Sequence, residues 1–235
     1  MVVGLAGCAQ LRPRRPEVRL GRVAPFSDSH GGLPPAWRPQ VPRPDLPRTR
    51  YEIVGLEGRR VLHAVAKGSG SGLRSALDID PLATPWLEWE WRAATVETRA
   101  TVAVDGLDDS PARVAVGFAG DGSALSLREQ VFGELLLAVT GYSLPFATLM
   151  YVWDGQAPVG SVFQYVRSSR IRYLVVESGP GRSGRWLSYR RNVVEDYRRV
   201  FGGEPGRIED VGIVTDSDDL NTSLETWYGD IAFRG

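Results

Sequence analysis

The segment Trp86–Ala93, with the sequence WLEWEWRA, alternates apolar and charged side chains. Leu87, Trp89 and Trp91 would share one face of an extended strand, and the charged residues between them would share the other. Successive side chains of a strand point to opposite faces, so this pattern predicts a half-buried antiparallel strand.

Short segments of this kind recur from Tyr51 to the end of the chain, and glycine and proline interrupt them. YEIVGLEGRRVLHAVAKG predicts a hairpin with its turn near Glu57-Gly58. About ten such segments predict a mainly β fold, an antiparallel β-sandwich of the jelly-roll type forming one domain over residues 50–235. The other predicted strands are GLRSALDID, ARVAVGF, TLMYVW, IRYLVVES, RWLSYRR, RIEDVGIVTD and ETWYGDIAF.

Two segments depart from this pattern and predict short inserted helices. Apolar residues recur every four positions over residues 127–139, and Ser126 with Glu129 fits a capping box before them. The second segment, NVVEDYRRVFGGEP, has Asn192 as its predicted N-cap and Gly202 as its predicted stop.

Composition narrows the classes of protein to consider. The 235 residues are 43% hydrophobic, which suffices for one well-cored domain, and their formal net charge is zero. A balanced charge argues against nucleic acid as a partner. Cys8 is the only cysteine, so no internal disulfide can form. No stretch reaches the roughly 20 apolar residues of a membrane-spanning helix.

The first residues suggest a lipid anchor. Leu5-Ala6-Gly7-Cys8 resembles the bacterial lipobox, in which a branched residue and two small residues precede a lipidated cysteine. Residues 1–8 are interpreted as a truncated signal remnant, because a full signal has a longer apolar region. Ala9 after the cysteine favours the outer membrane, with the protein facing the periplasm. The alternative is a chance apolar start with an inert cysteine.

Residues 9–49 are rich in proline, which fixes φ and lacks an N–H, so they predict an extended tether rather than regular structure. Phe26 and Trp37 are expected to dock this arm onto the domain.

Three groups of polar residues could form a site. Asp108 and Asp109 precede Arg113, which opens a predicted strand, so an arginine could hold a ligand oxygen or an acid at a sandwich edge. A turn with a salt bridge explains the same pattern.

The second group is Arg190, Arg191, Asn192, Glu195 and Asp196. Arg190 and Asn192 are candidates for ligand binding, although this arrangement suits a structural role equally well.

The third group is the acidic loop with Asp216, Asp218 and Asp219, which could supply oxygens to a cation such as calcium. The EF-hand glycine and glutamate are absent, and a solvated turn is the alternative. His30 and His63 are the only histidines, which argues against a zinc site.

Tryptophans could stack on sugar rings if they are exposed. Trp153 and Trp227 are the first choices for ligand binding, since both lie near acidic residues in the sequence. Large aromatic residues on alternating strands are, however, also typical of a core.

A series of segments resembles the domain-of-unknown-function family 3047, a set of bacterial envelope proteins. The likeness extends from about Phe26 to Phe233 and implies an envelope location. The ending WYGDIAF resembles the last strand of galactose-binding-like jelly rolls. This resemblance agrees with the predicted fold but does not indicate which ligand would bind. The segments in order are RYEIV, PWLEWEWR, DDSPARVAVGF, LMYVWDG, VVESG, RNVVEDYRRVFGGEP, TDSDD and YGDIAF.

Three functions are compatible with these observations. The first is a lipid-anchored, non-catalytic module that binds a glycan or an envelope protein, with the membrane reached only through the anchor. The second is a carbohydrate-active hydrolase that uses Asp108, Asp109, Glu195 or Asp196 as acid and base. The third is an envelope assembly factor with an apolar contact surface. The sequence gives no indication of the oligomeric state.

Overall fold

The structure, a computed structural model, describes residues 17–235, so the predicted lipidation of Cys8 lies outside the described residues. The strands are β1 (Trp37–Gln40), β2 (Arg50–Leu56), β3 (Arg59–Lys67), β4 (Gly70–Ile79), β5 (Trp86–Ala93), β6 (Ser110–Phe118), β7 (Ala147–Asp154), β8 (Val162–Gln164), β9 (Ile171–Ser178), β10 (Leu187–Asn192), β11 (Ile208–Asp216), β12 (Ser223–Tyr228) and β13 (Ala232–Arg234). The helices are α1 (Leu127–Thr140) and α2 (Val193–Phe201), with short 3-10 turns at Gly122–Ala124 and Pro180–Arg182.

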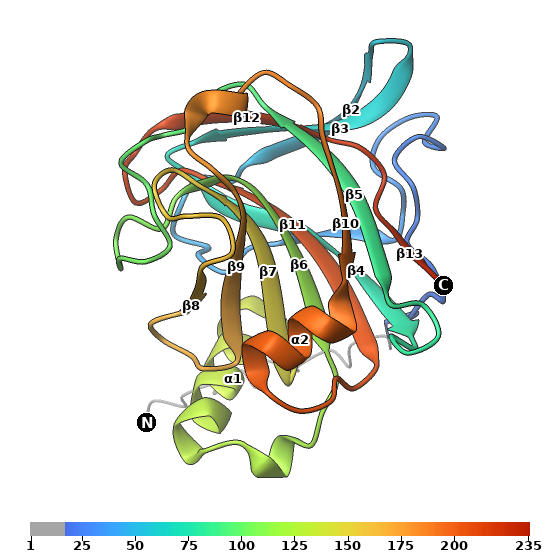
Figure 1. Cartoon of the computed structure of the whole chain (residues 1–235), viewed down its shortest axis with the longest axis vertical. Coiled ribbons are helices and arrows are strands. Elements are labelled where there is room, and N and C mark those ends of the chain that lie inside the picture. Colours follow the sequence, from blue (N-terminus) through green and yellow to red (C-terminus); the bar gives the residue numbers. More distant parts are fainter. Residues whose placement is uncertain (1–16) are drawn as a thin grey trace, which may run out of the picture.

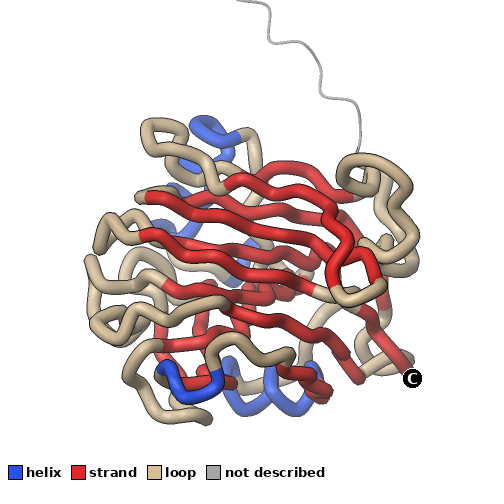
Figure 2. The backbone as a smooth tube through the Cα atoms, turned by 90° about the horizontal axis from the view of Figure 1, so that it is seen from above, coloured by secondary structure: helices blue, strands red, loops and turns tan. Residues whose placement is uncertain are grey.

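Two curved sheets make up most of the molecule. A seven-stranded sheet has the order β1-β4-β11-β6-β7-β9-β8, and a six-stranded sheet has the order β10-β5-β12-β3-β2, with β13 also paired to β5. Figure 2 shows the strands running side by side across the molecule, with loops gathered at their ends. The predicted mainly β sandwich with two helices is confirmed. Its strands pair antiparallel except for β7 and β9, which are parallel. The chain between them forms β8, which pairs antiparallel with β9 at the edge of the sheet.

The alternation along β5 decides which side chains enter the core. Leu87, Trp89 and Trp91 are buried as predicted. They meet the core-facing residues of β7, with Trp89 5.0 Å from Tyr151 and Trp91 6.5 Å from Trp153 between ring centroids. The two sheets are therefore joined by aromatic side chains on alternate positions of facing strands.

The β2–β3 hairpin turns where predicted. Glu57 and Gly58 lie between the strands with φ angles of 53° and 77°. Positive φ at both central residues is typical of the tight turn that matches the twist of the flanking strands.

The proline-rich arm docks through the two predicted aromatics. Phe26 and Trp37 are buried with their rings 4.9 Å apart, and Asp230 accepts hydrogen bonds from the backbone N–H groups of Phe26 and Ser27. The arm also supplies β1, which pairs with β4 at the edge of the seven-stranded sheet. Through β1, the arm thus contributes a strand to the sandwich.

Both helices lie at the same end of the sandwich (Figure 1). Ser126 and Asn192 cap them as predicted, each side chain accepting a hydrogen bond from a backbone N–H of the first turn. The capping box at α1 is only half formed, because the Glu129 carboxylate turns away from Ser126. It accepts hydrogen bonds from the Ser168 hydroxyl and the Ser169 N–H instead.

Helix α1 carries apolar residues on both of its faces. Leu127, Val131 and Leu135 are 76%, 55% and 61% exposed on the outer face. Phe132 and Leu136 lie on the inner face, toward the seven-stranded sheet. Among the residues described, no helix has the length and apolar character needed to span a membrane.

Candidate functional site

A cavity of about 270 Å³ lies on the outer face of the seven-stranded sheet. Alternation along β6 places it there. Val114 and Val116 point into the core between the sheets, whereas Arg113 and Ala115 line the cavity on the opposite face. Helix α1 bounds one end of this pocket, and the acidic loop after β11 bounds the other.

Glycines form the part of the pocket floor contributed by β4 and β11. A Cβ atom on Gly70 would lie 2.7 Å from Asp218 Oδ1 and 3.1 Å from Asp216 Oδ1. A Cβ atom on Gly72 would lie 2.5 Å from the Ile213 carbonyl oxygen. Any larger residue would displace these groups, so the glycines let the carboxylates and the neighbouring strand approach the floor.

Arg113 is the central cation of the pocket, and its side chain is only 6% exposed. Its Nη2 donates to the Asp108 carboxylate at 2.8 Å and to the Asp108 backbone carbonyl, and its Nη1 lies 3.4 Å from Asp216 Oδ2. The Tyr173 hydroxyl donates to the other oxygen of Asp108 at 2.8 Å. Burial lowers the pKa of Arg113, but Asp108 and Asp216 raise it by more, so the guanidinium remains charged.

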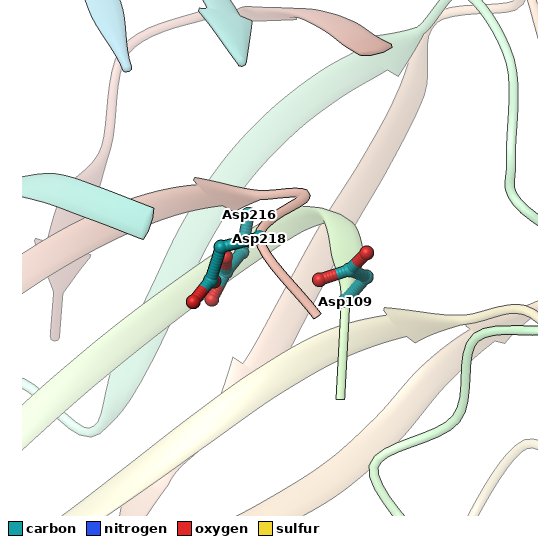
Figure 3. Close-up of side chains that lie close together, drawn as sticks. All are labelled: Asp109, Asp216 and Asp218. Carbon is teal, nitrogen blue, oxygen red and sulfur yellow. The ribbon is translucent and has the colours of Figure 1, made fainter. Parts of the chain in front are cut away.

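Three polar atoms on residues that line the pocket lack partners. Arg113 Nε and Asp216 Oδ1 at the charged end and Thr148 Oγ1 at the end near α1 are buried, and none has a hydrogen-bond partner among the described residues. Burial raises the pKa of Asp216 well above its ordinary value; Arg113 opposes this rise, and the neighbouring Asp218 adds to it. Figure 3 shows the carboxylates of Asp216 and Asp218 close together and pointing the same way.

The acidic loop is held by Asp108 and Asp109. Asp109 accepts hydrogen bonds from the N–H groups of Asp219 and Leu220, both at 3.0 Å, and Asp219 accepts one from the Asp108 N–H at 2.9 Å. Burial raises the pKa of Asp109, and these backbone donors oppose that rise. Asp109 therefore shapes the loop rather than facing a ligand.

The predicted cation site takes a different form in the structure. Asp109, Asp216 and Asp218 each offer an oxygen within 4.8 Å of the others, whereas Asp219 is not part of this group (Figure 3). Both Asp109 oxygens already accept backbone hydrogen bonds, and the Arg113 guanidinium lies beside Asp216. Calcium takes six to eight oxygens, and in this group the carboxylate oxygens left without a partner are few.

The group around α2 lies elsewhere and has structural partners. Asn192 caps α2, and Asp196 accepts hydrogen bonds from the Tyr151 hydroxyl and Arg191 Nε. Glu195 is exposed. Neither Glu195 nor Asp196 lines the pocket that contains Asp108.

Arg190 is on the outer face of the other sheet. Its guanidinium lies 3.9 Å from the centroid of the Trp86 ring and forms an ion pair with Glu88. It does not take part in the pocket.

Neither tryptophan chosen from the sequence lines the pocket. Trp153 is fully buried in the core, where its indole N–H donates to the Gly179 carbonyl, so the expectation that it offers a face to a ligand is wrong. Trp227 is half-buried on the six-stranded sheet and stacks on His63 at 5.0 Å.

The aromatic residues that do line the pocket are tyrosines. Tyr142 follows α1, Tyr165 precedes β9, and Tyr173 lies on β9. Tyr173 would share one face of its strand with Ile171 and Val175. The opposite face, with Leu174 and Val176, is similarly apolar. No local signal therefore indicated which face would be the pocket.

Asp216→Asn tests the burial of this carboxylate. The raised pKa means that the native state binds a proton more tightly than the unfolded state. The contribution of Asp216 to the free energy of unfolding should therefore decrease as the pH rises above about 4. We expect urea unfolding between pH 5 and 8 to show a smaller fall in stability for this variant than for the wild type. Asp45→Asn, at an exposed ion pair, should keep the wild-type slope; equal slopes for all three proteins would contradict the assignment.

Comparison with solved structures finds distant similarity. The family 30 carbohydrate-binding module of a cellulosomal cellulase of Clostridium thermocellum is 11% identical with a TM-score of 0.44, over 91% of this chain and 97% of the module. The carbohydrate recognition domain of Emp47p is 11% identical with a TM-score of 0.44, over 92% and 95%. An arabinose-bound GH51 α-L-arabinofuranosidase is 8% identical with a TM-score of 0.42 over 89% of this chain, which spans 25% of that enzyme.

Sequence comparison is more decisive for the family. No curated protein matches the chain. The model of the family described as "Protein of unknown function (DUF3047)" matches residues 35–232, which is most of the chain and includes every pocket strand. The chain belongs to the DUF3047 family.

Proposed function

We propose that this protein is a non-catalytic glycan-binding protein of the bacterial envelope, and that the glycan binds in the pocket on the seven-stranded sheet. The observation that carries the proposal is that, at the charged end of the pocket, two buried atoms of lining residues have no hydrogen-bond partner, Arg113 Nε and Asp216 Oδ1. One is a donor and the other an acceptor, and a buried polar atom without a partner costs free energy. A sugar hydroxyl both accepts and donates, so vicinal hydroxyls can satisfy both atoms.

The charge of the lining indicates which glycans fit. Carboxylates outnumber guanidinium groups, so an anionic ligand would be repelled, whereas neutral and amino sugars would be accepted. Half-buried Tyr165 adds an aromatic surface at the pocket wall. The charged lining residues are Asp105, Asp108, Asp210, Asp216, Asp218, Asp219, Arg43, Arg113 and Arg167.

The arrangement of the acids favours binding over hydrolysis. A glycosidase places two carboxyl groups on either side of the scissile bond. Here Asp216 and Asp218, at the end of β11 and just after it, point the same way (Figure 3). Both oxygens of the Asp108 carboxylate already accept hydrogen bonds, one from Arg113 and one from Tyr173.

The envelope location rests on the sequence Leu5-Ala6-Gly7-Cys8 and the proline-rich segment after it. We expect Cys8 to carry a diacylglyceryl group when the gene is expressed in a bacterium from a start site that supplies a full signal. Mass spectrometry of the N-terminal peptide measures this. Globomycin should block the cleavage before Cys8, and Cys8→Ser should release the protein from the membrane fraction. A Cys8 thiol without lipid would refute the anchor and leave the pocket proposal unaffected.

Glycan binding is tested with an array of neutral, amino and acidic oligosaccharides, followed by calorimetry of the soluble domain with the selected sugars. We expect neutral or amino sugars to bind. Asp218→Asn and Gly70→Ala should weaken binding at least tenfold, because the first removes an acceptor and the second pushes both carboxylates out of place. Trp227→Ala, on the other sheet, should bind like the wild type.

Three results would contradict the proposal. These are no binding by any neutral or amino sugar, binding that survives both pocket changes, or loss of binding in Trp227→Ala. Release of reducing ends from a bound oligosaccharide would indicate hydrolysis instead. Thermal unfolding of each variant checks that the fold is retained.

A further inference from the structure

The end of the pocket next to α1 is apolar. The register between β6 and β7 orders the lining, because Arg113 pairs with Val152, Ala115 with Met150 and Gly117 with Thr148. Moving along the strands from Val152 to Thr148 therefore leads away from Arg113 and Asp216 and toward α1, where Asp210 is the charged lining residue and is paired with Arg74. We call this end the apolar half; its apolar lining residues are Phe132, Leu136, Leu144, Met150 and Ile171. Tyr142, Thr148 and Asp210 also line it, and the Asp210 carboxylate is paired with Arg74 and Tyr142.

Part of this apolar surface is open to the cavity. Phe132, Leu136 and Met150 are only half-buried, although all three lie on the inner side of α1 or on the sheet beneath it. A hydrophilic glycan alone would leave this surface in contact with water. An apolar group in the cavity would bury it.

Polar contacts hold α1 at a distance from the sheet. Glu129, the one buried residue of the helix, accepts hydrogen bonds from Ser168 and Ser169 in the loop before β9. Beyond the C-terminal end of the helix, the Tyr142 hydroxyl donates to Asp210 on β11 at 3.2 Å. Between these two anchors, the inner side chains of α1 bound a cavity instead of packing closely on the sheet.

The apolar half and the charged half are one continuous cavity. Asp210 and Asp216 both line it and are six residues apart on β11, which corresponds to about 20 Å along the strand. A ligand that fills the pocket therefore meets the unpartnered Asp216 oxygen at one end. At the other end it meets aliphatic and aromatic side chains beside Asp210, whose carboxylate is already paired with Arg74 and Tyr142.

We propose that the ligand is an amphiphile, with a neutral or cationic sugar head at Arg113 and Asp216 and an alkyl chain beneath α1. This inference rests on the proposed glycan binding for the head and adds the class of molecule, a glycolipid. Each methylene that enters the apolar half should strengthen binding by up to about fourfold.

Alkyl glycosides test the inference. The probes are the methyl, butyl and hexyl glycosides of glucose, galactose, mannose and N-acetylglucosamine, and their binding to the whole protein is measured by calorimetry. We expect affinity for at least one sugar to rise tenfold or more from methyl to hexyl. Leu136→Gln should abolish this rise, because it places a polar group in the apolar half. Leu135→Gln is the matched control, since the adjacent leucine is 61% exposed on the outer face of α1.

The outcomes separate this inference from the proposed function. If a methyl glycoside binds and chain length has no effect, the inference is refuted and glycan binding stands. If the rise with chain length persists in Leu136→Gln, or is lost equally in Leu135→Gln, the chain does not lie beneath α1 and the inference is also refuted. If no glycoside of any length binds, both proposals fail.

Discussion

The buried guanidinium of Arg113 is the interaction on which the pocket depends. A charge this far from water is stable only with close opposite charges, and Asp108 and Asp216 supply them from two loops that are distant in the sequence. Removing one partner of such a buried pair typically costs about 3–5 kcal/mol, because the other charge is left uncompensated. Arg113 thus fixes the turn before β6 and the loop after β11 relative to each other, and with them the polar half of the pocket.

The outer faces of the two sheets differ in how their side chains are arranged. On the six-stranded sheet, the aromatic surfaces are covered by cations, with Arg190 over Trp86, Arg59 over Trp186 and Arg92 over Trp227. On the seven-stranded sheet, glycines lower the floor and the helix α1 stands away from it, so a cavity remains. Cations also lie over Tyr142 and Tyr173 on the pocket side, so the glycine floor and the position of α1, rather than the aromatic content, account for the candidate site on this sheet.

Much of the fold follows from local patterns in the sequence. The alternation along β5, the turn at Glu57-Gly58 and the caps at Ser126 and Asn192 depend on residues close in the chain, and the structure confirms them. The parallel pairing of β7 with β9 was not foreseen, since pairing across a crossover is decided by packing between distant segments.

The candidate site was only partly predictable. Asp108, Arg113 and Asp216 were each singled out from the sequence, and the sheet brings them together because β6 and β11 are neighbours. Trp153 was predicted to be an exposed ligand-binding residue, whereas its side chain lies on the core side of β7. An alternating pattern separates two faces, but when both faces are apolar it cannot tell which one faces the other sheet. Tyr173 on β9 was missed for the same reason. Tyr142 and Tyr165 lie outside the strands, so no alternation placed them at the pocket.

The most direct test of the central claim is the NMR signal of the Arg113 Nε–H group, recorded with and without a bound neutral glycan. If the pocket is a sugar site, the unpartnered Nε–H gains an acceptor, so its resonance should shift and its exchange with solvent should slow, while the indole N–H of Trp227 stays unchanged. A bound glycan that leaves the Arg113 signal unchanged and moves that of Trp227 would place the site on the other sheet and contradict the account.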